Sequence, residues 1–319
     1  MKVKQGLTAA LLLIAVQALA QGYPSRPVKL LVGVPPGGPT DTVARAVAPE
    51  LGEALGQPIV VENRPGASGV IATDAVAKAQ PDGHTLAFIY ITHATNPSLI
   101  AKLPYDTLRD FAPVSLVGRQ SMVLLANPAF AANSVQELVA AAKAAPGRID
   151  YGASDAGSAP HLAAELFKMM AGIDLTPIYY KGTAPALTDL LAGQIPVMFV
   201  SNISALPHVK AAKLKALGVT GAQRTPLAPD IPTIAESGLA GYEAYGWYGI
   251  AAPARTPGAV IARLQAEVAR IAQSPAMKAR LAAQGLELVG NSPAEFEAFI
   301  RAEIDKWRAV LKAAGIKPG

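Results

Sequence analysis

The sequence predicts an α/β protein made of two doubly wound lobes joined by a hinge. Two observations lead to this fold class. Short apolar runs rich in β-branched residues alternate with amphipathic helical stretches along most of the chain, a pattern typical of sheets covered by helices. The alternation is interrupted by a long extended segment, 111–126, and then begins again. The chain therefore has enough elements for two such lobes.

The first twenty residues have the form of a secretory signal peptide. Lys2 and Lys4 precede a short apolar run, 11–16, and Ala18-Leu19-Ala20 has the small-x-small pattern of a cleavage site. The apolar run is shorter than the ~20 residues that cross a bilayer. We therefore expect cleavage after Ala20 and an exported, periplasmic mature chain.

The composition argues against a nucleic-acid-binding protein and against a disulfide-stabilised one. Removing Lys2 and Lys4 lowers the net charge from +5 to +3, and the remaining basic residues are spread out rather than clustered. No nucleic-acid partner is expected from such a pattern. The chain has no cysteine, so its stability must come from its core, for which a hydrophobic content of 51% is ample.

The first lobe occupies the chain up to about residue 120. Its strands are continuous apolar runs, as expected of strands buried on both faces. The expected elements are a strand at Val28–Val34, a helix at Thr40–Leu55, a strand at Pro58–Glu62, a helix at Gly69–Ala79 and a strand at His84–Tyr90.

The second lobe begins where the extended segment ends. Ser134 and Glu137 have the spacing of a capping box that starts its first helix, and Gly172 ends its second. The expected strands are Ile149–Ala153, Thr176–Tyr180, Ile195–Val200 and Leu214–Val219, with a helix at Ala159–Ala171.

The end of the chain is helical. One helix is expected at Thr256–Gln273, and another begins at the capping box Ser292–Glu295 and ends at Gly315. Neither has strands of its own to cover, so both should pack back on the first lobe. The chain then crosses between the lobes twice, near 116–125 and near 247–252, which makes a hinge. The expected division is 1–20 for the signal peptide, 21–121 with 248–319 for the first lobe, and 122–247 for the second.

A glycine-rich turn joins the first strand to the first helix. Pro36, Gly37 and Gly38 precede Thr40 and Asp41, without the Lys-Ser/Thr pair or the G-x-G-x-x-G spacing of a nucleotide loop. Glycines let the backbone approach a ligand, and free N–H groups at the helix start suit a carboxylate. A plain turn with Thr40 or Asp41 as N-cap is the alternative, and the residues alone leave the two even.

A second strand–turn–helix junction lies at the corresponding place in the second lobe. It contains Ser154, Asp155, Gly157, Ser158 and His161. Ligands of open α/β sheets bind at the carboxyl ends of strands, so this loop should face the first one across a cleft. A cap formed by Ser158 and a structural role for His161 are the alternatives. The local sequence G-A-S-D-A lacks the last glycine of the G-x-S-x-G elbow of serine hydrolases.

Other residues that follow strands are expected to face the same cleft. They are Thr92 and His93, in the loop after a first-lobe strand, and Lys181. The four histidines show no metal-ligand spacing, and thiols are absent, so neither a metal nor a cofactor is expected. Trp247 and Tyr248, on the return crossing, either stack on a planar ligand or fill the core between the lobes.

Short motifs recur along the whole mature chain. They include Pro36-Gly37-Gly38-Pro39-Thr40-Asp41, Val60–Ala67 (VVENRPGA), Pro81-Asp82-Gly83, Leu103–Asp106 (LPYD), Tyr151-Gly152, His161-Leu162, Tyr180-Lys181-Gly182, Ala184–Leu190 (APALTDL) and Trp247-Tyr248-Gly249. In this set and order, the chain resembles the substrate-binding proteins of tripartite tricarboxylate transporters, often called the Bug family.

The resemblance implies a hinged, two-lobed periplasmic binding protein of the Venus-flytrap type, with no catalytic activity. It implies that the loops Pro36–Asp41 and Ser154–Ser158 hold a small organic carboxylate, mainly through backbone N–H groups and ordered water. It also implies membrane subunits of a tripartite tricarboxylate-type transporter as partners. The protein itself is expected to act as a monomer.

The second loop departs from the family's usual pattern, YGSxGxGTxxHL. Ala153 stands in place of a serine, Asp155 of a glycine and Ser158 of a threonine. Val200 and Ser201 stand where an Asp-Asn pair is common, which makes Ser201 a further candidate contact. Asp155 brings a negative charge to where a second ligand anion would lie. We expect it to select against ligands with two carboxylates, unless it turns outward and caps the next helix.

Two non-enzymatic functions share this fold, and the sequence does not separate them. One is a receptor that delivers its ligand to membrane transporter subunits, and the other is a periplasmic sensor that reports occupancy to a signalling protein. A serine hydrolase is a remote third alternative, because the members of a triad can assemble in space.

Overall fold

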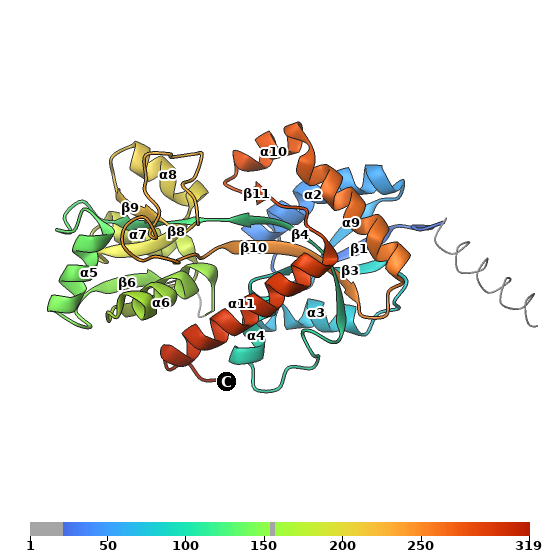
Figure 1. Ribbon diagram of the computed structural model, residues 1–319, viewed down its shortest axis with the longest axis horizontal. Helices are drawn as coiled ribbons and strands as arrows, with labels where there is room; N and C mark the ends of the chain where they lie inside the picture. The colour runs from blue at the N-terminus through green and yellow to red at the C-terminus, as the bar shows by residue number, and fades with distance from the viewer. Residues whose placement is uncertain (1–21, 154–156) are drawn as a thin grey trace, which may run out of the picture.

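Two β-sheets lie one after the other along the long axis of the molecule, each covered by helices (Figure 1). The computed structural model of the protein describes residues 22–153 and 157–319. The first sheet has the order β11-β4-β10-β3-β1-β2, formed by β1 (Val28–Val32), β2 (Ile59–Asn63), β3 (Thr85–Tyr90), β4 (Phe111–Gln120), β10 (Gly246–Pro253) and β11 (Glu287–Leu288). The second has the order β7-β6-β8-β5-β9, formed by β5 (Met122–Ala126), β6 (Asp150–Ala153), β7 (Thr176–Tyr179), β8 (Val197–Ser201) and β9 (Lys215–Val219).

Both sheets are mixed, and each contains three neighbouring strands that are parallel. β1 is parallel to β2 and β3, and β6 is parallel to β7 and β8. β10 runs antiparallel to β3 and β4, and β5 runs antiparallel to β8 and β9. The reason is connectivity. β5 and β10 begin where the chain arrives from the other sheet, so they run away from the junction at which the parallel strands end.

The helices around the first sheet agree largely with the prediction. α2 (Pro39–Leu55) ends at Gly56, whose φ of 75° is left-handed, and α3 (Val70–Ala77) is slightly shorter than expected. α4 (Thr92–Leu99) corrects the expectation of a loop after the third strand. Its residues are mostly polar and include Pro97, so no apolar period indicates a helix there.

Four helices cover the second sheet, and only part of their expected capping is present. Ser134 accepts the Glu137 N–H at 3.1 Å, but the Glu137 carboxylate bonds to the Asn133 N–H instead of completing a capping box. Gly172 ends its helix in the left-handed conformation, as predicted. The helices are α5 (Val135–Ala144), α6 (Ala159–Ala171), α7 (Thr183–Leu191) and α8 (Asn202–Lys210).

The C-terminal helices differ in what they cover. α9 (Gly258–Gln273) lies on β4, as expected, and α10 (Pro275–Ala282) lies beside α9 and β11. α11 (Pro293–Ala313) begins at the predicted Ser292 capping box. It packs on β4 and α4 of the first half, as expected, and it also contacts α6 of the other half, which the sequence did not predict (Figure 1).

One hydrophobic cluster passes through the junction between the sheets. It contains Leu31 and Ile89 of the first sheet, Phe199 of the second and Trp307 on α11. A second cluster lies between the first sheet, α2 and α9, and a third lies between the second sheet, α7 and α8. The two halves are therefore joined by a common hydrophobic core as well as by the chain that crosses between them.

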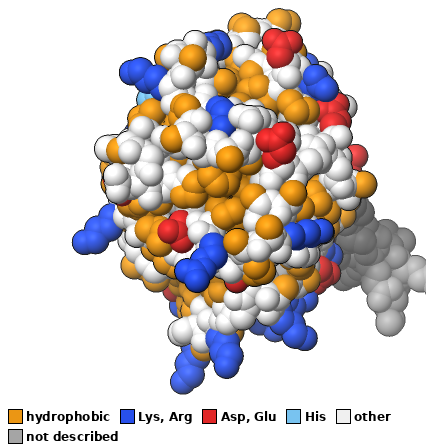
Figure 2. Space-filling view, turned by 90° about the vertical axis from the view of Figure 1, so that its left-hand side faces the viewer, with side chains coloured by type: hydrophobic (Ala, Val, Ile, Leu, Met, Phe, Trp, Pro, Cys, Tyr) orange, Lys and Arg blue, Asp and Glu red, His pale blue; other side chains and the backbone are white. Residues whose placement is uncertain are grey.

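The end of the molecule formed by the second sheet has a mixed surface. Figure 2 shows hydrophobic side chains gathered toward the middle of this face and Lys and Arg side chains spread around its margin. Within residues 22–153 and 157–319, no helix is long and apolar enough to cross a membrane.

Candidate functional site

The carboxyl ends of strands from both sheets meet at a cavity of about 540 Å³. Loops that leave β1, β3, β6 and β8 surround it, and the two stretches of chain that cross between the sheets form one wall. This is the edge at which open α/β sheets bind ligands. The described lining residues are Val34, Pro39, Thr40, Ser68, Tyr90, Ile91, Thr92, Gln120, Met122, Gly157, Ser158, Ala159, Pro160, Thr183, Ser201, Gly246, Trp247 and Tyr248.

Four helices begin at this cavity, two from each half of the molecule. Thr40 is the second residue of α2, and Thr92, Ala159 and Thr183 are the first residues of α4, α6 and α7. The first N–H groups of a helix have no partner within the helix, and its dipole adds partial positive charge there. Helix starts that converge from both halves favour an anion in the space between them.

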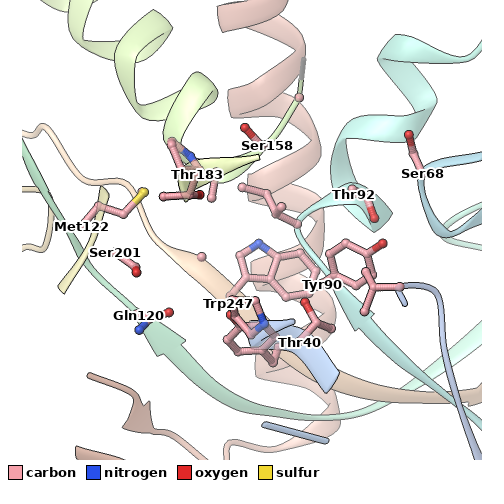
Figure 3. A pocket seen from close by; sticks show the side chains of 18 residues that line it. Thr40, Ser68, Tyr90, Thr92, Gln120, Met122, Ser158, Thr183, Ser201 and Trp247 are labelled. Atoms are coloured by element: carbon pink, nitrogen blue, oxygen red, sulfur yellow. The ribbon is translucent and has the colours of Figure 1, made fainter. Parts of the chain in front are cut away.

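The described lining offers neutral hydrogen-bonding groups and no ionised side chain. Figure 3 shows Thr183 and Ser158 above Trp247, with Thr92 to its right. Burial raises the pKa of Tyr90, so its hydroxyl stays protonated and able to donate. The remaining wall is apolar. An anionic group would therefore be held by backbone N–H and hydroxyl donors, with hydrocarbon packed beside it.

Asp41 organises the loop before α2 instead of lining the cavity. Its carboxylate accepts the Gly37 N–H at 2.9 Å, the Arg45 Nε–H at 2.9 Å and the Asn63 amide at 2.8 Å. Burial alone would raise the pKa of Asp41, but the bonds from Arg45, Gly37 and Asn63 outweigh it and lower the pKa. Gly37 has a φ of 88°, which a residue with a side chain rarely adopts.

Ser68 reaches the cavity from a strained turn. Its φ of 54° is left-handed, and it lies in a short 3₁₀ turn, Ala67–Gly69, between β2 and α3. The buried Asn96 amide donates to the Ser68 carbonyl at 3.1 Å and holds this turn against α4. Strained non-glycine residues of this kind cluster at functional sites.

His161 holds Gly157, just before α6, from behind the cavity. It is completely buried and does not line the cavity. Its Nδ1 accepts the Gly157 N–H at 3.1 Å, so its proton is on Nε2, which donates to the Tyr179 hydroxyl at 3.2 Å. Burial lowers the pKa of His161, with Glu165 opposing and Lys168 reinforcing this change. The neutral ring thus acts as a support for the loop.

Two other predicted site residues, His93 and Lys181, also lie outside the lining. His93 lies inside α4, buried between Tyr105 and Phe111, and burial lowers its pKa to about 4 against an opposing bond to the Thr107 backbone. It does not line the cavity, because the helix turns its ring into the core. Lys181 is exposed and also outside the lining.

The structure brings only part of the predicted set to the cavity. Thr40, Thr92, Gly157, Ser158 and Ser201 line it, whereas the Pro36–Gly38 turn stands beside it. Ser154 and Asp155 lie outside the described residues, so the selectivity expected of Asp155 stays a prediction.

Sequence reasoning missed four polar lining residues. Tyr90 ends a strand and Thr183 begins a helix. The expectation that ligands bind at the carboxyl ends of strands would have found both residues if it had been applied to every strand–helix junction. Ser68 and Gln120 carry no local signal. Only the tertiary arrangement puts a 3₁₀ turn and a crossing strand at the same cavity.

The contacts of His161 bear on the serine-hydrolase alternative. Both ring nitrogens of His161 are engaged, with Gly157 and Tyr179, so neither is left to activate a nucleophile. Across residues 22–153 and 157–319, no cluster of three or more His, Asp or Glu side chains has the arrangement of a metal site.

Comparison with known proteins gives matches over nearly the whole chain. Protein BugT of Bordetella pertussis is 38% identical over 95% of this chain and 94% of its own length. The R. palustris protein Rpa4515, whose structure was solved with adipate, is 38% identical with a TM-score of 0.80, covering 93% of this chain and all of that one. MatC of Rhodopseudomonas palustris, solved with bound malate, is 33% identical with a TM-score of 0.75, covering 91% of this chain and all of that one.

These solved structures have the same two-sheet α/β fold, which confirms the predicted fold class. A family model described as the tripartite tricarboxylate transporter family receptor matches residues 43–316. That match covers most of the chain, and the identities above agree with it. The chain therefore belongs to the tripartite tricarboxylate transporter receptor family.

Proposed function

We propose that this protein captures a small organic carboxylate in the cavity between its sheets. The observation that carries the proposal is the convergence of four helix starts, from both halves, on a cavity whose described lining has donors but no ionised side chain. Unpaired N–H groups and partial positive charge suit a carboxylate without a buried cation. The volume of about 540 Å³ is within the usual range for small-molecule sites.

Relatives support the same ligand class. Rpa4515 was solved with adipate and MatC with malate, and both ligands are carboxylates. The apolar part of the lining, which includes Trp247 and Met122, suits the hydrocarbon portion of such an acid. We propose that the ligand is released unchanged, because the cavity supplies positioning groups without a catalytic set.

Delivery to a membrane transporter is the second part of the proposal. The family is described as the receptor of tripartite tricarboxylate transporters, which supports a role upstream of membrane subunits. The N-terminal pattern supports export to the periplasm with cleavage after Ala20. We propose that the protein reaches its partners there as a monomer.

Capture is proposed to involve closure of the two halves around the ligand. The chain passes from β4 to β5 at Ser121 and returns before β10, so two short stretches connect the sheets. These crossings support the division into 21–121 with 248–319 and 122–247. Loops from both halves then contact the same ligand, which stabilises the closed arrangement.

The test is calorimetry and thermal unfolding of the mature chain with a panel of carboxylates and their neutral amides. A ligand at a hundredfold excess over its Kd should add about 2.7 kcal/mol to the free energy of unfolding. The amides should add nothing, because their NH₂ groups oppose the N–H donors of the helix starts. Thr183→Val should weaken carboxylate binding, and Thr188→Val, on the exposed face of the same helix, should not.

Two results would contradict this function. One is a nucleotide or sugar that binds while every carboxylate fails. The other is a chemically altered ligand after long incubation with the pure protein. For delivery, uptake of the identified carboxylate should be lost in cells that lack the gene and restored by the wild-type protein, but not by Thr183→Val.

A further inference from the structure

Both tryptophans of the protein donate to one buried carboxylate. The Trp247 Nε1–H bonds to Glu303 Oε2 at 3.0 Å, and the Trp307 Nε1–H bonds to the same oxygen at 2.7 Å. Glu303 lies on α11 and is only 5% exposed. Hydrogen bonds to a charged acceptor are about twice as strong as neutral ones, so this pairing fixes both rings.

Trp247 is also part of the ligand cavity. It lies on β10 next to the crossing between the sheets and stands in the centre of the lining in Figure 3. Phe296 and Phe299 of α11 pack edge-on against its ring, with centroids 6.1 and 5.5 Å away. The indole N–H is therefore engaged on the α11 side, and the ring offers the cavity its carbon surface.

The charge of Glu303 is compensated on the side away from Trp247. The Lys306 ammonium pairs with Glu303 Oε1 and also lies 4.5 Å from the centroid of the Trp307 ring. A buried carboxylate without this partner would be unfavourable, and it would also oppose an anionic ligand nearby. The pair thus keeps a strong acceptor behind the cavity wall without leaving a net charge there.

We propose that Glu303 is a positioning residue that selects for the carbon skeleton of the ligand. It holds the Trp247 N–H out of the cavity, so that this wall is apolar and disfavours a ligand hydroxyl group at that place. The proposal rests on the proposed function, since it concerns the ligand of the same cavity. Through the shared Glu303 Oε2, α11 fixes the orientation of Trp247, which lies 56 positions earlier in the chain.

The experiment compares succinate with malate, which differ by one hydroxyl group, by calorimetry. In Glu303→Leu the Trp247 N–H loses its acceptor and is free to turn toward the cavity, where it can bond to the malate hydroxyl. The ratio of the malate Kd to the succinate Kd should fall about tenfold, the change expected for one gained hydrogen bond. Glu303→Gln keeps an acceptor oxygen and should keep the wild-type ratio.

Two further variants make the result specific. Glu297→Leu removes an exposed glutamate of the same helix that pairs with Arg301, and it should leave the ratio unchanged. Trp247→Phe keeps an aromatic wall without an N–H group. It should weaken both ligands and still keep their ratio, because the N–H does not face them.

The proposal is wrong if folded Glu303→Leu keeps the wild-type ratio, or if Trp247→Phe changes it. Should Glu303→Leu fail to fold, Trp247→Phe and Glu303→Gln still decide the question. Trp307→Phe leaves Trp247 as the sole tryptophan, and in that background, with excitation selective for tryptophan, Glu303→Leu should shift the emission maximum while Glu297→Leu should not. If wild type binds no carboxylate at all, the proposed function fails, and this emission test still examines the Glu303 contact separately.

Discussion

Asp41 shapes the glycine-rich turn before α2 through its own hydrogen bonds. Three donors, the Gly37 N–H, Arg45 and Asn63, reach its carboxylate within 3.0 Å. The Asn63 amide also donates to the Val34 carbonyl. Such a residue is an N-cap candidate from its position alone. The structure shows that it instead folds the glycine turn back on the helix start.

Removing the charge of Asp41 should therefore affect both stability and binding. Asp41→Asn leaves the Gly37 N–H and Arg45 with a weaker acceptor, and we expect a loss of about 2 kcal/mol in the free energy of unfolding, measured in urea. Ligand affinity should fall as well, since the loop loses its shape. Asp305→Asn, which removes an exposed partner of Arg308, is the control and should change neither. Equal effects of the two substitutions would exclude the loop role.

Buried histidines make the protein sensitive to acid. The native state keeps His93 neutral down to about pH 4, whereas the unfolded chain protonates it near pH 6.5. As the pH falls through this window, the unfolded state binds the proton first and stability is lost. From this residue alone, the free energy of unfolding should fall by about 2 kcal/mol between pH 7.5 and pH 5. The pKa of His161 is lowered in the same direction.

The measurement is urea unfolding at a series of pH values. His93→Phe keeps a ring between Tyr105 and Phe111 but cannot titrate, so its stability should depend less on pH over this window. His208→Gln, on α8, is the control and should retain the wild-type slope. A His93→Phe profile parallel to that of wild type would contradict the assignment.

The helix starts at the cavity are set by small residues as well as by caps. Gly157, two residues before α6, lies against the end of α4, and a Cβ on it would be 2.6 Å from Leu99 Cδ1. Gly157 also has a φ of 79°. It therefore allows both the loop conformation and the close approach of the two halves beside the cavity.

Gly157→Ala should weaken ligand binding, because the added methyl group separates the start of α6 from α4. Gly172→Ala is a matched control at the other end of α6. Its φ of 60° is equally left-handed, but nothing lies within 4 Å of its Cβ. Each substitution should cost about 1 kcal/mol of stability through backbone strain. Only Gly157→Ala should also raise the ligand Kd, measured by calorimetry, and a similar rise in both variants would show that the interhelical contact is irrelevant.

Packing contacts join the two halves in addition to the two chain crossings. α11 contacts elements of both, and one hydrophobic cluster includes residues of both sheets. Chains with two domains often unfold in separate steps. Shared core opposes this, because opening one half exposes apolar surface of the other.

Thermal unfolding should therefore be a single cooperative transition despite the two sheets. Differential scanning calorimetry should give equal calorimetric and van't Hoff enthalpies. Tryptophan fluorescence, which reports on the α11 side, should change at the same temperature as the far-ultraviolet circular dichroism of the whole chain. Two resolved transitions would show that the junction does not couple the halves.

The sequence by itself determined the local elements, because their signals are local. Apolar runs marked β1 and β3, the stripe in α2 marked an amphipathic helix, and the Ser292 box marked the start of α11. The expectation that ligands bind at the carboxyl ends of strands pointed to Thr40 and Ser158, and both line the cavity. It could not find α4, whose apolar contacts follow no helical period, nor could it tell that His93 and His161 turn into the core.

Tertiary structure alone decided what depends on residues far apart in the chain. Gln120 and Ser68 line one cavity although they belong to a crossing strand and a distant turn. Glu303 on the last helix bonds to Trp247, and α11 reaches both sheets. Such contacts leave no periodicity in the sequence. Packing two sheets and a long helix around one junction brings these groups within hydrogen-bonding distance, and the same arrangement forms the cavity.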